Sequence, residues 1–397
     1  MKQTCQVAIV GAGPVGTFAA YCLAELGIDV MVFETGDHCA QDMRASTFHP
    51  PTLEMLDEMG IADNLIAQGL KAPVYRHRDR RTGEIIEFDF SELAELTRYP
   101  FRLQCEQFKM AELLARQLDA HSHADIRFNN RVLGFQSHET HVDIDIETPM
   151  NIESIRAQYL IGADGANSII RKWLNLEFEG FTYPEKFLTL STSLPIEDYI
   201  KDLCYVNYIS DPEEWMVLLK VPTAWRILVP GHLEDDELIS DEYKASLFKR
   251  LLGTDTPVST NHRTVYRVHQ RVVEKYNHGR VIVIGDAAHL NNPLGGFGMN
   301  SGIHDAWSLK NALQNILNHN GNQDRLLNAF DNERRSIMRG FIQSQTIKNK
   351  KMMEATKAEA QRVFSAELKS TAENPALRRE FLLKQSMIKC PNRAEAA

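Results

Sequence analysis

QVAIVGAGPVG, at residues 6–16, determines the architecture that the rest of the chain has to fit. Its first five residues are apolar and predict a buried strand, and residues 14–26 predict a helix with small side chains on one face. Residues 29–33 (DVMVF) predict a second strand. A strand, a helix and a strand in this order indicate a parallel sheet with a right-handed crossover.

The three glycines of this stretch fit a turn that binds a dinucleotide. Gly11 allows the tight turn, Gly13 lets the backbone approach a pyrophosphate, and Gly16 lets the helix pack closely on the sheet. The helix N-terminus offers free N–H groups to phosphate. Glu34, at the end of the second strand, is placed to accept hydrogen bonds from a ribose. The pattern predicts dinucleotide binding, and a purely structural glycine-rich turn is the alternative.

Two further motifs each follow a short apolar strand. The first is GADGANS at residues 162–168, followed by Arg171. The second is GDAAH at residues 285–289, which continues through PLGGFGMN at residues 293–300. Each motif places an aspartate just after the strand, where open α/β sheets present their ligand-binding residues.

Composition excludes several classes of protein. The formal net charge of −9 argues against a general nucleic-acid binder, which needs clustered Lys and Arg to contact phosphates. No stretch has the charge-free apolar length of a membrane span. The six cysteines are scattered without metal-ligand spacing, so we expect no metal site and reduced thiols in a cytoplasmic protein.

With the three motifs in this order, the chain resembles the class A flavoprotein monooxygenases, the family of para-hydroxybenzoate hydroxylase and phenol hydroxylase. The resemblance covers roughly residues 4–345 and is strongest at residues 6–34, 159–171 and 281–309. It implies an α/β fold, in which a Rossmann-like FAD-binding domain carries an inserted, mostly β substrate domain and a helical C-terminal segment.

The division of the chain that we expect is discontinuous. The FAD-binding domain would comprise residues 1–72, 102–177 and 270–340, the substrate domain residues 73–101 and 178–269, and the C-terminal helical segment residues 341–397.

The resemblance also assigns residues that contact the cofactor. They are Gly11, Gly13, Gly16, Glu34, Arg44, Gln104, Asp164, Asp286, Pro293, Gly296, Gly298, Met299 and Asn300. Residues 293–300 would lie around the isoalloxazine ring, and a helix is expected to begin near Asn300 or Ser301. The positive end of that helix, if it points at the flavin N1–C2=O edge, stabilises the negative charge of a reduced flavin.

Catalytic residues are harder to assign, and each candidate has a structural alternative. His49 is expected near the flavin edge and could touch the substrate. Arg226, on a predicted strand, could meet an anionic substrate or form a structural ion pair. Tyr208 could line the pocket or simply pack. His289 could be a base, but a motif histidine that packs near the cofactor is the simpler interpretation.

The implied activity is hydroxylation of an aromatic or heteroaromatic ring with NADH or NADPH and O2, through a flavin C4a-hydroperoxide. The partners would be a small aromatic substrate and O2, with no nucleic acid and no stable membrane insertion, in a monomer or homodimer. A phenol, hydroxybenzoate, hydroxypyridine, quinolone or natural-product intermediate would all fit. Three alternatives are a flavin-dependent reductase or dehydrogenase, a halogenase-like enzyme, and a non-catalytic FAD-bound interaction protein.

Overall fold

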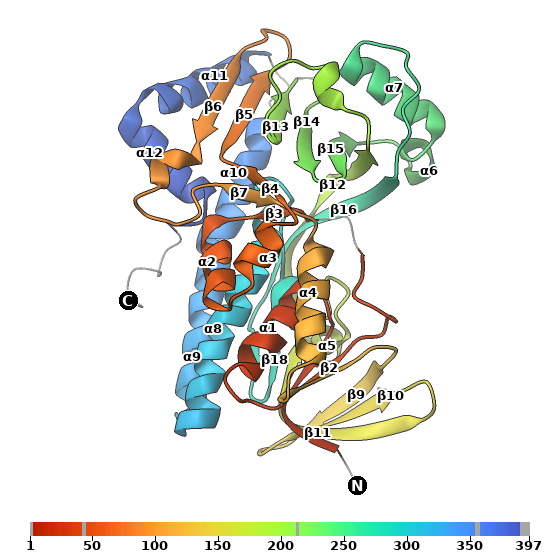
Figure 1. The fold of residues 1–397 in the computed structure, drawn as a ribbon, viewed down its shortest axis with the longest axis vertical. Coiled ribbons are helices and arrows are strands. Elements are labelled where there is room, and N and C mark those ends of the chain that lie inside the picture. The colour runs from red at the N-terminus through yellow and green to blue at the C-terminus, as the bar shows by residue number, and fades with distance from the viewer. Residues whose placement is uncertain (1–2, 42–44, 212–213, 354–357, 390–397) are drawn as a thin grey trace.

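The computed structural model describes residues 3–41, 45–211, 214–353 and 358–389 (Figure 1). In this view the N-terminal sheet and its helices occupy the lower half of the molecule, and a second sheet occupies the upper half. In the described part of the chain, none of the helices combines the length and the apolar character that crossing a membrane requires.

The lower half is built on a parallel sheet. Its strands lie in the order β17-β18-β11-β1-β2-β8, and β11, β1, β2, β8 and β18 pair in parallel. These strands are β1 (Gln3–Val10), β2 (Val30–Phe33), β8 (Ala124–Arg127), β11 (Ile152–Gly162), β17 (Asn277–His278) and β18 (Val281–Val283). Helices α1 (Pro14–Ala24), α4 (Gln107–Asp119) and α8 (Phe297–His319) pack around this sheet. The Rossmann-like sheet expected from residues 6–33 is confirmed.

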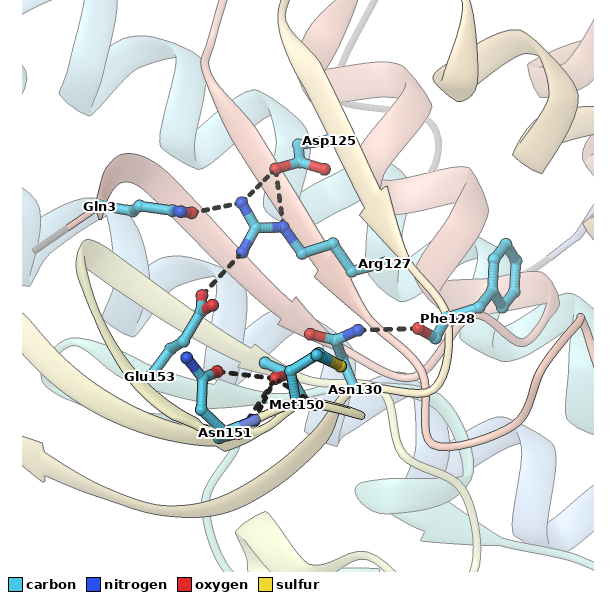
Figure 2. Close-up of polar contacts among 9 residues, drawn as sticks. Gln3, Asp125, Arg127, Phe128, Asn130, Met150, Asn151 and Glu153 are labelled. Atoms are coloured by element: carbon cyan, nitrogen blue, oxygen red, sulfur yellow. Dashed lines mark hydrogen bonds and ion pairs between the residues drawn. The ribbon is translucent and has the colours of Figure 1, made fainter.

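Arg127, at the end of β8 on one edge of this sheet, contacts side chains of two other strands (Figure 2). Its Nε donates to Asp125 at 2.8 Å, its Nη1 lies 3.6 Å from Glu153 on β11, and its Nη2 also reaches Gln3 on β1. β9 (Arg131–Ser137) and β10 (Val142–Glu147) extend antiparallel from β11. One guanidinium therefore holds together three strands that are far apart in the sequence.

The upper half is a second eight-stranded sheet, in the order β19-β16-β12-β15-β14-β13-β5-β6. The strands are β5 (Val74–Asp79), β6 (Ile85–Asp89), β12 (Phe178–Thr192), β13 (Val206–Ser210), β14 (Met216–Val221), β15 (Ala224–Gly231), β16 (His262–Val273) and β19 (His289–Leu290). The boundary that we predict at residues 269/270 falls within β16, and β19 pairs with that same strand.

A small third sheet lies between the two large ones. It has the order β3-β7-β4, from β3 (Thr47–Phe48), β7 (Arg102–Gln104) and β4 (Leu70–Ala72). β7 pairs antiparallel with both neighbours, so Thr47 lies opposite Gln104. This sheet brings residues 102–104 next to the segment in which the FAD-contacting residues near position 47 are expected.

The C-terminal segment is helical, as expected. α9 (Gln323–Ile337) is followed by α10 (Gln343–Met353), α11 (Ala358–Glu373) and α12 (Pro375–Gln385). α11 and α12 pack beside β6 at the upper left of Figure 1. Phe381 of α12 lies 4.6 Å from Phe88 of β6, ring centroid to ring centroid, and Arg378 binds Glu92 at 2.8 Å.

The helix expected near Asn300 or Ser301 begins three to four residues earlier, at Phe297. Its N-cap is Gly296, with φ of +71° in the left-handed region that favours glycine. Gly298 has a low helix propensity, which is why the sequence pattern placed the start later. Burial of Phe297 against His49, with ring centroids 5.3 Å apart, anchors this first turn.

Gly16→Ala is expected to lower the free energy of unfolding by about 1–3 kcal/mol, because overpacking of a close contact has costs of that size. A Cβ at Gly16 would lie 2.0 Å from the carbonyl oxygen of Gly11, a backbone atom that has to move. Urea unfolding of the two proteins measures the difference. Gly134→Ala is the matched control, because a Cβ there meets nothing within 4 Å. Equal effects of the two substitutions would contradict the close packing of α1.

Candidate active site

A cavity of about 760 Å³ lies at the carboxyl ends of β1, β2 and β11 and extends to the second sheet. Its volume is in the upper part of the range of about 300–1,000 Å³ that small-molecule sites occupy. Carboxyl strand ends are where open α/β sheets bind ligands. The cavity therefore joins the predicted dinucleotide turn to the sheet expected to bind substrate.

The glycine turn forms one end of this cavity. Gly11 and Gly13 line it, and Gly13 is the N-cap of α1. Gly11 has φ of +102°, and a Cβ there would lie 2.6 Å from the carbonyl oxygen of Ala163. Only glycine fits this conformation and this approach. The N-terminus of α1 therefore opens into the cavity, where its free N–H groups suit a phosphate.

Glu34 stands on the cavity wall next to this turn. Its carboxylate accepts the backbone N–H of Ala12 at 2.8 Å and that of Gly36 at 2.9 Å. The carbonyl oxygen of Glu34 in turn accepts the N–H of Asn130 at 2.9 Å. A carboxylate has about four acceptor positions, so two bonds to backbone leave capacity for ligand hydroxyls.

Asp164, from the second motif, lines the cavity and also binds the first N–H groups of a helix. Its Oδ2 accepts the N–H groups of Ile169 at 2.8 Å and Ile170 at 3.2 Å, at the start of α5 (Ile169–Trp173). Its Oδ1 is buried and has no hydrogen-bond partner among the described residues.

Arg171 connects the second motif to the third by hydrogen bonds to both. Its guanidinium donates to the carbonyl oxygens of Ala166 at 2.6 Å and Ala287 at 3.0 Å, and stacks 4.1 Å above the ring of Phe178. Asp286 lies in the short turn η3 (Gly285–Ala287), and its side chain is exposed within the cavity. The two aspartates of the two motifs thus reach one cavity.

A buried ionic cluster lies beneath that turn. Asp305 of α8 accepts hydrogen bonds from His289 Nε2 at 2.7 Å, Gly285 N–H at 3.1 Å and Arg334 Nε at 2.7 Å. Burial by itself would raise the pKa of Asp305, but the nearby His289 and Arg334 outweigh it and leave that pKa below its ordinary value of 3.8. The cluster fixes the turn that carries Asp286 against α8.

The loop of residues 293–296 and the first turn of α8 form the middle of the cavity wall, with Pro293, Gly296, Gly298 and Met299 on its lining. Asn300 lies fully buried behind them. Its amide donates to the carbonyl oxygens of Gly296 at 2.7 Å and Thr47 at 2.8 Å, and its oxygen accepts the N–H of His49 at 3.0 Å. Asn300 therefore braces the loop without facing the cavity.

His49 also lies behind the loop and is fully buried. Its Nε2 lies 2.8 Å from the carbonyl oxygen of Gly295, and its ring stacks on Phe297. Burial, then the charge of Arg102, hold the pKa of His49 well below its usual 6.5, so the ring is neutral. This position is that of a loop support, and His49 is not on the cavity lining.

The second sheet supplies the opposite wall. Tyr208 and Arg226 line it, as does Arg102 of β7, which no pattern in the sequence singled out. Arg267, His269 and Thr189 also lie on this wall, and the remaining lining side chains there are apolar or aromatic, among them Val206, Val217, Leu219, Leu228, Tyr266 and Val268. The carboxylates on the lining are Glu34, Asp164 and Asp286, which all lie at the Rossmann side. Among the described residues, the wall formed by the second sheet and Arg102 carries cations and no carboxylate.

The structure thus brings most of the predicted residues to one cavity. Gly16 and Asn300 support it from behind, Gln104 is buried with its oxygen 3.1 Å from the Thr47 hydroxyl, and Arg44 lies outside the described residues. His289 is fully buried at Asp305 rather than on the lining. The arrangement defines a dinucleotide-binding oxidoreductase site with an attached, largely apolar substrate pocket.

A separate group of possible metal ligands lies away from this cavity. In residues covered by the structure, His138, His141 and Asp143 have ligand atoms within 4.8 Å of one another, where β9 meets β10. Arg156 already binds Asp143, with Nε 2.9 Å from Oδ1 and Nη2 3.3 Å from Oδ2. Because this cation already pairs with the carboxylate, a metal ion would have to compete with it.

Comparison with known proteins agrees with this geometry. A family model described as an FAD binding domain matches residues 4–345. The para-nitrophenol 4-monooxygenase of Pseudomonas sp. (strain WBC-3) is 31% identical over 386 residues, 95% of this chain and 94% of that protein. The 6-hydroxy-3-succinoylpyridine 3-monooxygenase HspB of Pseudomonas putida (strain DSM 28022 / S16) is 32% identical over 86% of each chain.

The similarity extends to solved structures. The crystal structure of p-nitrophenol 4-monooxygenase PnpA from Pseudomonas putida DLL-E4 superimposes with a TM-score of 0.91 at 27% identity, over 97% of this chain and 99% of that chain. The chain belongs to the FAD-binding family of class A flavoprotein aromatic monooxygenases. FAD is its cofactor, and NAD(P)H and O2 are its co-substrates. These relatives do not favour the reductase, halogenase or non-catalytic alternatives.

Buried polar atoms around the cavity fit FAD. Asp164 Oδ1, Ser46 Oγ, Gln104 Nε2 and Asn291 Oδ1 are buried without hydrogen-bond partners in the described part of the chain. Buried polar groups are normally satisfied, so a polar ligand along this path accounts for them. An extended cofactor with phosphate, ribityl and pyrimidine groups supplies such partners.

Proposed function

We propose that this monooxygenase hydroxylates a small aromatic ring that carries an ionised hydroxyl group, such as a nitrophenol or a hydroxypyridine. The observation that carries the proposal is the charge of the substrate wall, where Arg102 and Arg226 stand among apolar side chains without a carboxylate. Apolar walls suit the ring, and the cations suit its ionised oxygen. Two relatives named for nitrophenol and hydroxypyridine substrates support this class.

The residues assigned from the sequence would hold FAD as follows. The α1 N-terminus with Gly11 and Gly13 binds the pyrophosphate, Glu34 the adenosine ribose, Asp164 and Asp286 the polar middle of the cofactor, and the loop of residues 293–299 the isoalloxazine ring. FAD supplies electron transfer from NAD(P)H and activation of O2. Gln104, Arg44, Gly16 and Asn300 complete the proposed set as contacts or supports.

The protein itself contributes orientation, charge and exclusion of water. Tyr208 and the aliphatic side chains of β13 and β14 line the part of the cavity proposed for the ring, where they would shield it from water. Exclusion of water prevents activated oxygen from being lost as H2O2. An arginine beside the substrate oxygen favours the ionised form, and an ionised oxygen donates electron density to the ring carbon that is hydroxylated.

The chain divides into the FAD-binding, substrate and C-terminal parts given above. The pairing of β16 with β19 links the first two parts. The protein acts in the cytoplasm, where the free cysteines of the described residues stay reduced. It works as a monomer or homodimer.

In a panel of phenols, hydroxybenzoates and hydroxypyridines, we expect the fastest NAD(P)H oxidation with rings whose hydroxyl ionises near neutral pH. Product mass should rise by one oxygen, with little H2O2. Burial, then Arg102, lower the pKa of His77 to about 3, and His49 is neutral as well. The pH dependence of kcat/KM should therefore follow the ionisation of each substrate. A midpoint near 6.5 shared by all substrates would contradict this, and NAD(P)H use without product would contradict hydroxylation.

A further inference from the structure

Arg102 is an unusual residue, because it is a cation with only 1% exposure on the wall of the catalytic cavity. Its Nη2 donates to the backbone carbonyl oxygen of Gln385 at 2.9 Å, and its Cζ lies 4.7 Å from the ring centroid of Tyr75 and 5.0 Å from that of Phe90. Its Nε is buried without a hydrogen-bond partner among the described residues, and no described carboxylate forms an ion pair with it.

A buried charge without a counter-ion is costly, so such a group usually has an ionic partner. Here the protein supplies only neutral compensation, namely two aromatic faces and a carbonyl at the C-terminus of α12. The negative end of a helix stabilises a cation but carries only about half a charge. The positive field of Arg102 reaches the two neighbouring histidines, His49 and His77, and lowers the pKa of both.

We infer that Arg102 binds the ionised oxygen of the aromatic substrate and that the C-terminal segment holds it in place for this task. The inference rests on the proposed function, whose substrate class it assigns to a particular side chain. Two arginines of the facing sheet also line the pocket: Arg226, which has interactions of its own within the protein, and Arg267, which is exposed. Arg102 differs from the exposed arginines of the lining because it is buried, and no described carboxylate forms an ion pair with it.

The C-terminal segment connects this anion site to the cofactor loop through Gln385. Its backbone carbonyl holds Arg102, while its side-chain Nε2 donates to Asn349 Oδ1 at 3.1 Å. Asn349 of α10 then donates to the carbonyl oxygen of Leu294 at 3.2 Å, in the loop of residues 293–296. All four residues are at least nine-tenths buried. Gln385 and Asn349 are therefore positioning residues that set the distance between the anion site and the loop.

The test is a binding titration of the FAD-loaded protein with 4-nitrophenol, across the pH range in which this phenol ionises. Flavin absorbance reports binding, and the phenolate band reports the ionisation state of the bound ligand. For Arg102→Gln we expect about 10- to 100-fold weaker binding of the phenolate, since hydrogen bonds to charged groups have energies of that size. The preference for the ionised form should also disappear, which a purely structural change would not produce.

Matched variants separate the causes. Arg98→Gln removes an exposed arginine four positions away, which pairs with Asp57, and should bind 4-nitrophenol as the wild type does. Arg102→Lys keeps the charge and should keep the preference for phenolate at reduced affinity, even if Arg102→Gln folds poorly. Gln385→Leu should weaken binding several-fold and shift the flavin spectrum, because it breaks the link to Asn349.

Two results would overturn the inference. An Arg102→Gln protein with wild-type affinity and pH dependence would show that Arg102 is not the anion site. In that case, product formation by the wild type would still support the hydroxylase function. The wild type is also titrated with azide, a small anion that needs no aromatic pocket. If it bound neither azide nor 4-nitrophenolate, Arg102 would not be an anion site for any substrate.

Discussion

Asp305→Ala is expected to lower the free energy of unfolding by about 3–5 kcal/mol, which is the cost of removing one partner from a buried ion pair. Asp305 and His289 have no exposed side-chain surface and Arg334 has 4%. Without the carboxylate, the guanidinium of Arg334 loses its buried ionic contact with residue 305, and the N–H of Gly285 loses its acceptor. The turn that carries Asp286 is then released, so we also expect weaker retention of FAD. Urea unfolding and fluorescence of released FAD measure the two effects.

A double-mutant cycle tests the charge argument. Arg334→Met removes the cation with a side chain of similar length. If the imbalance of charge is the main cost, Asp305→Ala combined with Arg334→Met should be more stable than the sum of the single changes implies. Strict additivity would mean that the two groups do not compensate each other, and would contradict the description of the cluster.

The same carboxylate predicts a pH dependence. Its folded pKa lies below the ordinary value of 3.8 because His289 and Arg334 outweigh the effect of burial. The stabilisation is therefore present above pH 3.8 and is lost as pH falls through the folded pKa. The wild type should lose stability more steeply with acid below about pH 4 than Asp305→Ala does.

The sequence predicts the cofactor half of the site because its requirements are local. Gly11 needs a left-handed conformation, and Glu34 has to lie at the end of a strand. Both conditions can be recognised from the few residues on either side. The family resemblance assigns Asp164 and Asp286 to the same cofactor, and both line one cavity in the structure. Two separate strand–turn motifs do not reveal by themselves that Arg171 joins them.

The substrate half depends on contacts between residues far apart in the chain. Arg102 meets Gln385 only after the whole C-terminal segment has packed, and nothing near either residue in the sequence indicates the pairing. His49 shows the opposite problem, because its position near the flavin loop was expected but its side chain is turned to Gly295 and Phe297. Which face a side chain takes is decided by tertiary packing, which a local pattern does not contain.

Asn300→Asp is the substitution expected to change the flavin itself most, given the proposed position of its ring at the start of α8. The carboxylate keeps the bond from the N–H of His49 but has no donor for the carbonyl oxygens of Thr47 and Gly296, which lie 2.8 Å and 2.7 Å from the amide nitrogen. Three oxygens would then face one another in a fully buried site. We expect FAD to bind at least 10-fold more weakly, since each unsatisfied buried group costs about 1–3 kcal/mol.

The added charge has a second consequence. α8 directs its positive end toward the cavity, which favours negative charge on a bound ring. A carboxylate in the first turn opposes that field, so the midpoint potential of bound FAD should fall, on the order of 30 mV, which corresponds to about 1.4 kcal/mol for two electrons. Asn300→Leu also loses the donors to Thr47 and Gly296, and in addition the bond from the N–H of His49, but it adds no charge and is the control for the charge. Equal potentials in the two variants would mean that the α8 N-terminus does not act on the ring, whereas a lower potential in Asn300→Asp alone would identify this helix end as the group that stabilises the reduced flavin.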